Sequence, residues 1–159
     1  MKDTGCTLQN HILTDAEKRE ICSWTYHGDY AIYNLPSYEV MKEKQIGFFN
    51  PDREQNYRAF YDEDCLIGFL NIKAEETEVF IGIGLKPELC GRGYGQLILH
   101  ETYQISKELH PDKPLYLEVR TWNERAIRCY QKAGFEIEGE HFEQRTGRGM
   151  GTFYRMIKA

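Results

Sequence analysis

Apolar residues alternate with polar ones along several stretches of the chain, in the pattern that is typical of β-strands. A first strand is expected over Gly5–Leu13. A hairpin is expected from Tyr57–Tyr61 and Cys65–Lys73, which are separated by a short acidic turn. A further apolar run, Thr77–Leu85, predicts the strand that precedes the most glycine-rich turn of the sequence.

Two helix starts are marked in the first third of the chain. Thr14 followed by Glu17 forms a capping box, and the helix should end near Ser23. Ser37 is a suitable cap for a second, short helix that runs to Lys44. The segment between them, residues 24–36, carries one Trp and three Tyr, which could line a binding wall or pack the first helix onto the sheet.

The second half of the chain alternates helical and strand patterns. Apolar residues at helical spacing predict a helix that stops before Pro111, and Gly134 marks the end of another helix over Asn123–Ala133. The strands expected around them are Pro114–Arg120, Glu136–Phe142 and Thr152–Ile157. Between the last two strands, glycines at 147, 149 and 151 predict a mobile loop that could cover a substrate.

The glycine turn, Gly91–Gly95, lies where the strand ending at Leu85 gives way to a helix. Glycines let a ligand approach the main chain, and the unpaired N–H groups of a helix start favour a phosphate. A dinucleotide fingerprint would need glycine at Gln96, and no Lys-Ser or Lys-Thr of a P-loop follows. The turn alone leaves open a helix start that binds no ligand.

A second motif decides the interpretation of the first. Asn123, Ala126 and Tyr130 are followed by Gly134-Phe135 at the end of the predicted helix. Together with the glycine turn, this order and spacing resembles the GCN5-related N-acetyltransferase (GNAT) family. The resemblance, clear over Val79–Phe135, implies an α+β fold with a mixed, mostly antiparallel sheet of six to seven strands and about four helices.

The resemblance implies that acetyl-CoA is the cosubstrate and that the glycine turn holds its pyrophosphate, without a metal. The cofactor-binding residues expected on this basis are Leu85, Gly91, Arg92, Gly93, Tyr94, Gly95 and Asn123. Leu85 would polarise the acetyl carbonyl through a main-chain N–H, and Asn123 would match the pantetheine amides. Arg92 could pair with a phosphate or be a solvated charge. Cys90 departs from the family pattern, which usually has Gln or Arg there.

Two residues are the candidates for proton transfer. The stretch Leu117–Arg120, with Asn123 and Tyr130 after it, resembles bacterial ribosomal-protein N-terminal acetyltransferases, which implies Glu118 as the base and Tyr130 as the acid. A carboxylate partly removed from water suits a general base, and a phenol suits a thiolate leaving group. Glu118 could instead order a neighbouring strand, in which case Glu78 or Glu143 would be the next carboxylates to consider.

Composition narrows the class of protein. The 159 residues, 41% of them hydrophobic, suit a single domain over residues 1–159. The net charge of -5 argues against a nucleic-acid surface and suits a basic substrate. Five scattered cysteines without C-x-x-C predict reduced thiols in a cytoplasmic protein, and no apolar run reaches the ~20 residues that span a bilayer.

We therefore expect an acetyl-CoA-dependent N-acetyltransferase that acts on a primary amine, either a small molecule or a peptide or protein N-terminus. The alternative is a non-catalytic acyl-CoA-binding or regulatory module on the same fold. No nucleic-acid or membrane partner is expected, and the sequence leaves a homodimer open. A cysteine nucleophile has no His and carboxylate partners that spacing can assign.

Overall fold

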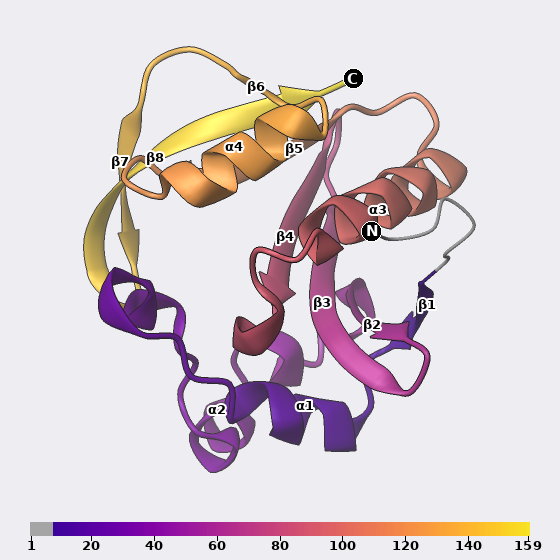
Figure 1. Ribbon diagram of the computed structural model, residues 1–159, viewed down its shortest axis with the longest axis vertical. Coiled ribbons are helices and arrows are strands. Elements are labelled where there is room, and N and C mark those ends of the chain that lie inside the picture. The colour runs from indigo at the N-terminus through magenta and orange to yellow at the C-terminus, as the bar shows by residue number, and fades with distance from the viewer. Residues whose placement is uncertain (1–7) are drawn as a thin grey trace. The chain divides into compact units, whose positions relative to one another are not determined.

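The computed structural model describes residues 8–159, which form one sheet of eight strands and four α-helices (Figure 1). The strands are β1 (Gln9–Ile12), β2 (Tyr57–Asp62), β3 (Cys65–Ala74), β4 (Val79–Leu85), β5 (Leu115–Arg120), β6 (Glu136–Ile137), β7 (Phe142–Thr146) and β8 (Gly149–Lys158). The α-helices are α1 (Asp15–Cys22), α2 (Tyr38–Lys44), α3 (Tyr94–Leu109) and α4 (Glu124–Lys132).

The strand order is β1-β2-β3-β4-β5-β8-β6, and β7 pairs with β8. Strands β4 and β5 run parallel, whereas β1–β2, β2–β3, β5–β8, β6–β8 and β7–β8 are antiparallel. This mixed sheet with four helices confirms the predicted α+β class. The sheet has eight strands rather than six to seven, because the expected strand Glu136–Phe142 is divided into β6 and the start of β7.

The chain divides into two compact units, and β3 and β4 run through both. The first unit, called here the N-terminal unit, holds residues 8–71 and 83–94 of the described chain. The second, the C-terminal unit, holds residues 72–82 and 95–159.

Capping residues define the two helices of the N-terminal unit. Thr14 and Glu17 form the predicted capping box at the start of α1, and the Ser37 side chain accepts from the Val40 N–H at the start of α2. The first strand begins at Gln9, and residues 5–7 of the prediction lie outside the described residues. The core of the unit is formed by buried apolar side chains: Leu13, Ile21, Trp24, Met41, Phe48, Ala59 and Leu66.

In the C-terminal unit, β5 is the central buried strand, and it pairs over its full length with β8. Helix α4 crosses in front of both strands in Figure 1. Asn123 caps the start of α4, and Gly134 follows its end with a φ of 99° that other residues rarely adopt. Helix α3 has a buried face that includes Ile98 and Leu99.

The prediction of a mobile loop between the last two strands is wrong. Thr146 of β7 pairs directly with Gly149 of β8, so only residues 147 and 148 make the turn of a tight hairpin. Gly149 has a φ of 97°, and Gly151 lies within the paired strand. Glycine is common in both loops and hairpin turns, so the spacing alone did not separate them.

Candidate functional site

The glycine turn of the N-terminal unit has an open main chain. Gly91 and Gly93 have φ values of 80° and 86°, and Arg92 between them is not among the residues with positive φ. A Cβ atom at either glycine would meet nothing within 4 Å. A positive φ at every second residue is typical of loops in which successive main-chain N–H groups bind an anion. The residues therefore fit the diphosphate for which the sequence predicts this turn.

Gly95, which begins the second unit, is required for a different reason. A Cβ atom there would lie 3.0 Å from the Cys129 sulfur of α4, and Gln96 donates from its Nε2 to the Cys129 carbonyl at 2.8 Å. Burial raises the pKa of the Cys129 thiol. Gly95 therefore lets the start of α3 pack closely on α4, and its role toward a phosphate stays a prediction.

Hydrogen bonds hold Tyr94, inside the turn, and Lys86, which directly follows β4. The Tyr94 hydroxyl donates to an Asp62 carboxylate oxygen at 2.8 Å, and the Lys86 N–H donates to the Ile67 carbonyl at 2.8 Å. Arg92 is exposed and forms no ion pair with a residue of the described range 8–159. Cys90, whose Sγ approaches the Lys86 carbonyl at 3.7 Å, lies four residues before α3 begins and so stands outside the first turn of that helix.

The aromatic segment after α1 has the packing role that the sequence left open, and its role as a binding wall stays a prediction. Trp24 is 7% exposed and belongs to the core, whereas the Tyr26 hydroxyl donates to the Leu85 carbonyl at 2.6 Å. This bond ties the segment to the end of β4. The segment also borders a hollow of about 640 Å³ that is lined by Glu20, Ser23, Trp24, Thr25, His27, Lys86 and Glu88.

Within the C-terminal unit, the parallel ladder between β4 and β5 is very short. Val79 pairs with Leu115 and Phe80 with Tyr116, and the two remaining β4 residues of this unit, Ile81 and Gly82, have no partner on β5. Ile81 and Gly82 of β4 therefore continue without ladder bonds to β5. A strand that leaves its neighbour in this way exposes main-chain N–H and C=O groups to a ligand.

Glu118 is partly buried on β5 and accepts a hydrogen bond from the Gln144 side chain of β7 at 3.1 Å. Both side chains lie on the same face, because β5 and β7 each pair with β8 and side chains of opposite residues share a face. Glu143, one residue earlier on β7, points to the other face and is exposed. Of these two carboxylates, Glu118 is the one that Gln144 orients.

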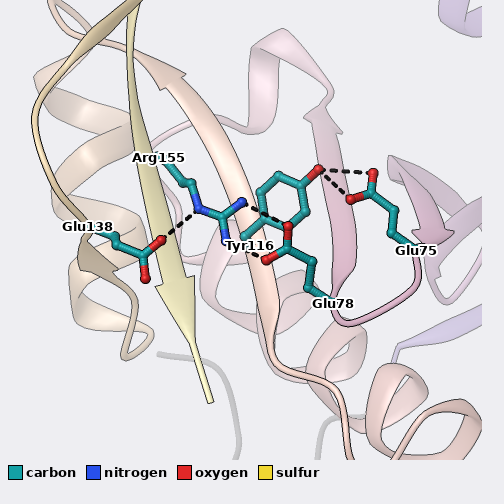
Figure 2. A network of polar contacts seen from close by, with 5 residues as sticks. All are labelled: Glu75, Glu78, Tyr116, Glu138 and Arg155. Atoms are coloured by element: carbon teal, nitrogen blue, oxygen red, sulfur yellow. Dashed lines mark hydrogen bonds and ion pairs between the residues drawn. The ribbon is translucent and has the colours of Figure 1, made fainter.

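Glu78 belongs to a polar network around Arg155, the residue of β8 that pairs with Glu118 (Figure 2). Arg155 donates to both Glu78 oxygens, one of them at 3.0 Å, and to Glu138 at 2.8 Å. These bonds from Arg155 hold the pKa of Glu78 below its ordinary value. Tyr116, which donates to Glu75 at 2.9 Å, lies under the Arg155 guanidinium. A carboxylate held ionised by an arginine is a poor general base.

The structure places Asn123 and Tyr130 on one helix. The Asn123 side chain, 7% exposed, accepts from the Ala126 N–H at 3.2 Å, so its oxygen serves as the helix cap. Tyr130 is partly buried in the last turn of α4, with its ring edge-on to Phe135 at 6.2 Å between centroids. The oxygen of Asn123 thus has a structural partner in the helix itself.

Sequence reasoning missed three side chains near these elements. Arg120 lies two residues after Glu118 on the same strand, and this alternation was visible in the sequence. The contacts of Gln144 with Glu118 and of Tyr26 with Leu85 join residues that are far apart in the chain. No local pattern predicts those two contacts.

The fold has close counterparts among solved structures. An acetyltransferase of the GNAT family from Bacillus anthracis matches with a TM-score of 0.76 at 15% identity, over 96% of this chain and 94% of that one. An aminoglycoside acetyltransferase in complex with coenzyme A matches with a TM-score of 0.72 at 16% identity, over 96% and 95% of the two chains. The fold is therefore that of the GNAT acetyltransferases.

The sequence comparison gives the family. Residues 17–135 match the acetyltransferase (GNAT) family, and the chain belongs to it. An N-alpha-acetyltransferase from Sulfurisphaera tokodaii is 29% identical over 110 residues, which are 65% of this chain and 66% of that protein. The chain spans 35% of the length of a second curated relative, a mycothiol acetyltransferase from Mycolicibacterium smegmatis.

Two features are absent from the part of the chain that the structure describes. No helix within residues 8–159 combines the length and the apolar character that a membrane crossing requires. Within the same range, no group of three or more His, Cys, Asp or Glu side chains is arranged to hold a metal ion.

Proposed function

We propose that this protein transfers the acetyl group of acetyl-CoA to a primary amine. The observation that carries the proposal is the glycine turn, in which Gly91 and Gly93 leave the main chain open and take backbone angles that other residues rarely adopt. The match of residues 17–135 to an acetyltransferase family supports the same chemistry.

The proposed reaction is a direct transfer. The amine nitrogen attacks the acetyl carbonyl, the bond from that carbon to sulfur breaks, and coenzyme A leaves as its thiol. Glu118 removes a proton from the amine, directly or through a water molecule, and Tyr130 supplies the proton to the sulfur. A main-chain N–H near Leu85 stabilises the charge that develops on the carbonyl oxygen. Glu118 is supported by its orientation toward Gln144 on a shared strand face.

A thiol-release assay with acetyl-CoA and a panel of amines tests the proposal. The panel should hold a peptide with a free N-terminus, a polyamine and an aminoglycoside, because the relatives differ in acceptor. We expect amine-dependent release of coenzyme A, with an acetylated product of the correct mass. Calorimetric binding of acetyl-CoA without release for any amine would instead indicate the acyl-CoA-binding module that the sequence leaves open.

A further inference from the structure

Arg120 is a buried cation that lacks a carboxylate partner among residues 8–159. Arg120 is only 9% exposed. The other buried charged residues are paired: Lys18 contacts Glu54 at 2.8 Å, and Glu17 contacts His11 at 2.6 Å. Burying an unpaired charge is costly, so such a group usually has a further role or partner.

The contacts of the guanidinium leave most of its donors unused. It lies over the Phe153 ring at 4.9 Å from the centroid, and its Nη2 approaches the Thr146 hydroxyl at 3.5 Å, the outer limit of a hydrogen bond. That hydroxyl already donates to the Gly149 carbonyl at 2.9 Å. A guanidinium has five N–H donors in a planar fork that suits oxygen acceptors.

Gly151 of β8 makes room for this guanidinium. A Cβ atom at Gly151 would lie 2.4 Å from the Arg120 Nη1 and 2.9 Å from the Phe153 ring. No φ in the left-handed region explains the glycine here. The lack of a side chain at Gly151 therefore makes room for the Arg120 guanidinium. A substitution at Gly151 can displace the guanidinium without removing its charge.

The cation and the proposed base lie on one face of one strand. Arg120 pairs with Phe153 and Glu118 with Arg155 along β8, so Arg120 and Glu118 alternate with the buried Val119. Two residues along a strand are separated by roughly 6–7 Å. This places a carboxylate for an ammonium group and a guanidinium for an oxygen at a spacing that a single small ligand can bridge.

We propose that Arg120 binds the carbonyl or carboxylate oxygen that adjoins the acceptor amine, and so selects α-amino groups. The inference deepens the proposed function and rests on it. The shared chemistry is an amine with a carbonyl oxygen a few bonds away, as in a peptide N-terminus or a free amino acid. Amines without a carbonyl, such as n-butylamine and spermidine, offer nothing for the guanidinium to bind.

The test compares kcat/KM for a peptide amide, a free amino acid and n-butylamine in wild type and in Arg120→Met. Met keeps an unbranched apolar stem and removes the donors. A hydrogen bond to a charged group predicts a loss of roughly 10- to 100-fold for the substrate with a carbonyl, and little change for n-butylamine. Whether the peptide or the amino acid suffers the loss identifies the source of the oxygen.

Two further variants separate recognition from folding. Gly151→Ala should displace the guanidinium and cause a smaller loss that is again confined to carbonyl-bearing acceptors. Arg145→Met, the same change on the exposed opposite face of β7, should alter no acceptor. An equal loss for all amines in Arg120→Met, or no loss for any, overturns the inference.

If wild type acetylates none of the three amines, the proposed function fails, and calorimetry then judges the inference alone. A peptide amide that binds wild type and loses affinity in Arg120→Met supports the role of Arg120. Equal affinity in both proteins, or no binding to wild type, overturns it.

Discussion

Arg155 of β8 clamps Glu78, which lies 77 residues earlier in the chain, by donating to both of its carboxylate oxygens. The pair lies about three quarters buried, with side-chain exposures of 26% and 24%. Because β8 and the turn before β4 are joined here within the C-terminal unit, the pair closes a long loop of chain (Figure 2). Its contribution should be visible in the stability of the protein.

We predict that Glu78→Gln lowers the free energy of unfolding at pH 7 by about 1–2 kcal/mol, between the values for exposed and for buried ion pairs. Because Arg155 lowers the folded-state pKa of Glu78, the stabilisation is complete above the unfolded pKa and is lost as pH falls through the folded one. Urea unfolding at pH 7 and pH 3 measures both effects, and the difference between the proteins should shrink at pH 3.

Glu138→Gln is the matched control, since Glu138 shares Arg155 but is 49% exposed and is contacted through Nε alone. It should cost less than Glu78→Gln. Equal stability of wild type and Glu78→Gln at pH 7 would contradict a stabilising role for the clamp.

Acetyl-CoA binding should depend on Gly93. Gly93→Asp places a side chain and a negative charge in the open main chain of the turn, so we expect at least a tenfold loss of affinity by calorimetry. Gly139→Asp is a matched control, because Gly139 also has a positive φ, 71°, and open space. It introduces the same backbone strain elsewhere and should leave affinity unchanged. Similar losses in both variants would point to strain rather than to ligand contact.

The contrast between Gly93 and Gly95 shows what the sequence could and could not predict. Both are glycines of one motif, yet only Gly93 faces open space, while Gly95 is held against Cys129 of another helix. A side chain at Gly95 would disturb helix packing before it tested phosphate binding. Sequence spacing places the turn correctly, but the packing partner of each glycine comes from a distant segment.

Local signals were otherwise reliable. The Thr14–Glu17 capping box and the Ser37 cap depend on bonds within four residues, and the structure forms both as predicted. The hairpin at residues 147 and 148 and the Gln144–Glu118 bond depend on strand pairing, which no short pattern specifies. The family resemblance predicted the fold because it combines two motifs that are separated in the chain, the glycine turn and the motif from Asn123 to Phe135.

Tyr130→Phe should reduce kcat by roughly 10² to 10⁴, the range for general acid catalysis, without changing acetyl-CoA affinity. The change removes the hydroxyl and keeps the ring that packs against Phe135. Steady-state kinetics with a good amine measures the effect. Tyr103→Phe, which removes a hydroxyl that donates to the Ala159 carbonyl, should leave kcat unchanged. Wild-type turnover in Tyr130→Phe would make Tyr130 a structural residue.

Glu118→Gln should lower kcat and remove the acidic limb of the pH dependence of kcat/KM. A general base must be ionised to accept a proton, so activity falls as it becomes protonated, and a Gln side chain cannot titrate. Gln keeps the size of the side chain and can still accept a hydrogen bond from Gln144, which limits structural change. Acetyl-CoA affinity should therefore be retained.

Glu143→Gln is the control for Glu118→Gln, because it removes a carboxylate one residue from Gln144 on the opposite, exposed face of β7. It should leave the acidic limb in place. Were the limb to survive in Glu118→Gln and disappear in Glu143→Gln, the base would lie on the other face of the sheet, and Glu118 would be left with the role of orienting β7 through Gln144. If the acidic limb survives in both variants, neither Glu118 nor Glu143 is the base. Glu78 is already held by Arg155, so the proton transfer would then belong to a group outside this strand pair.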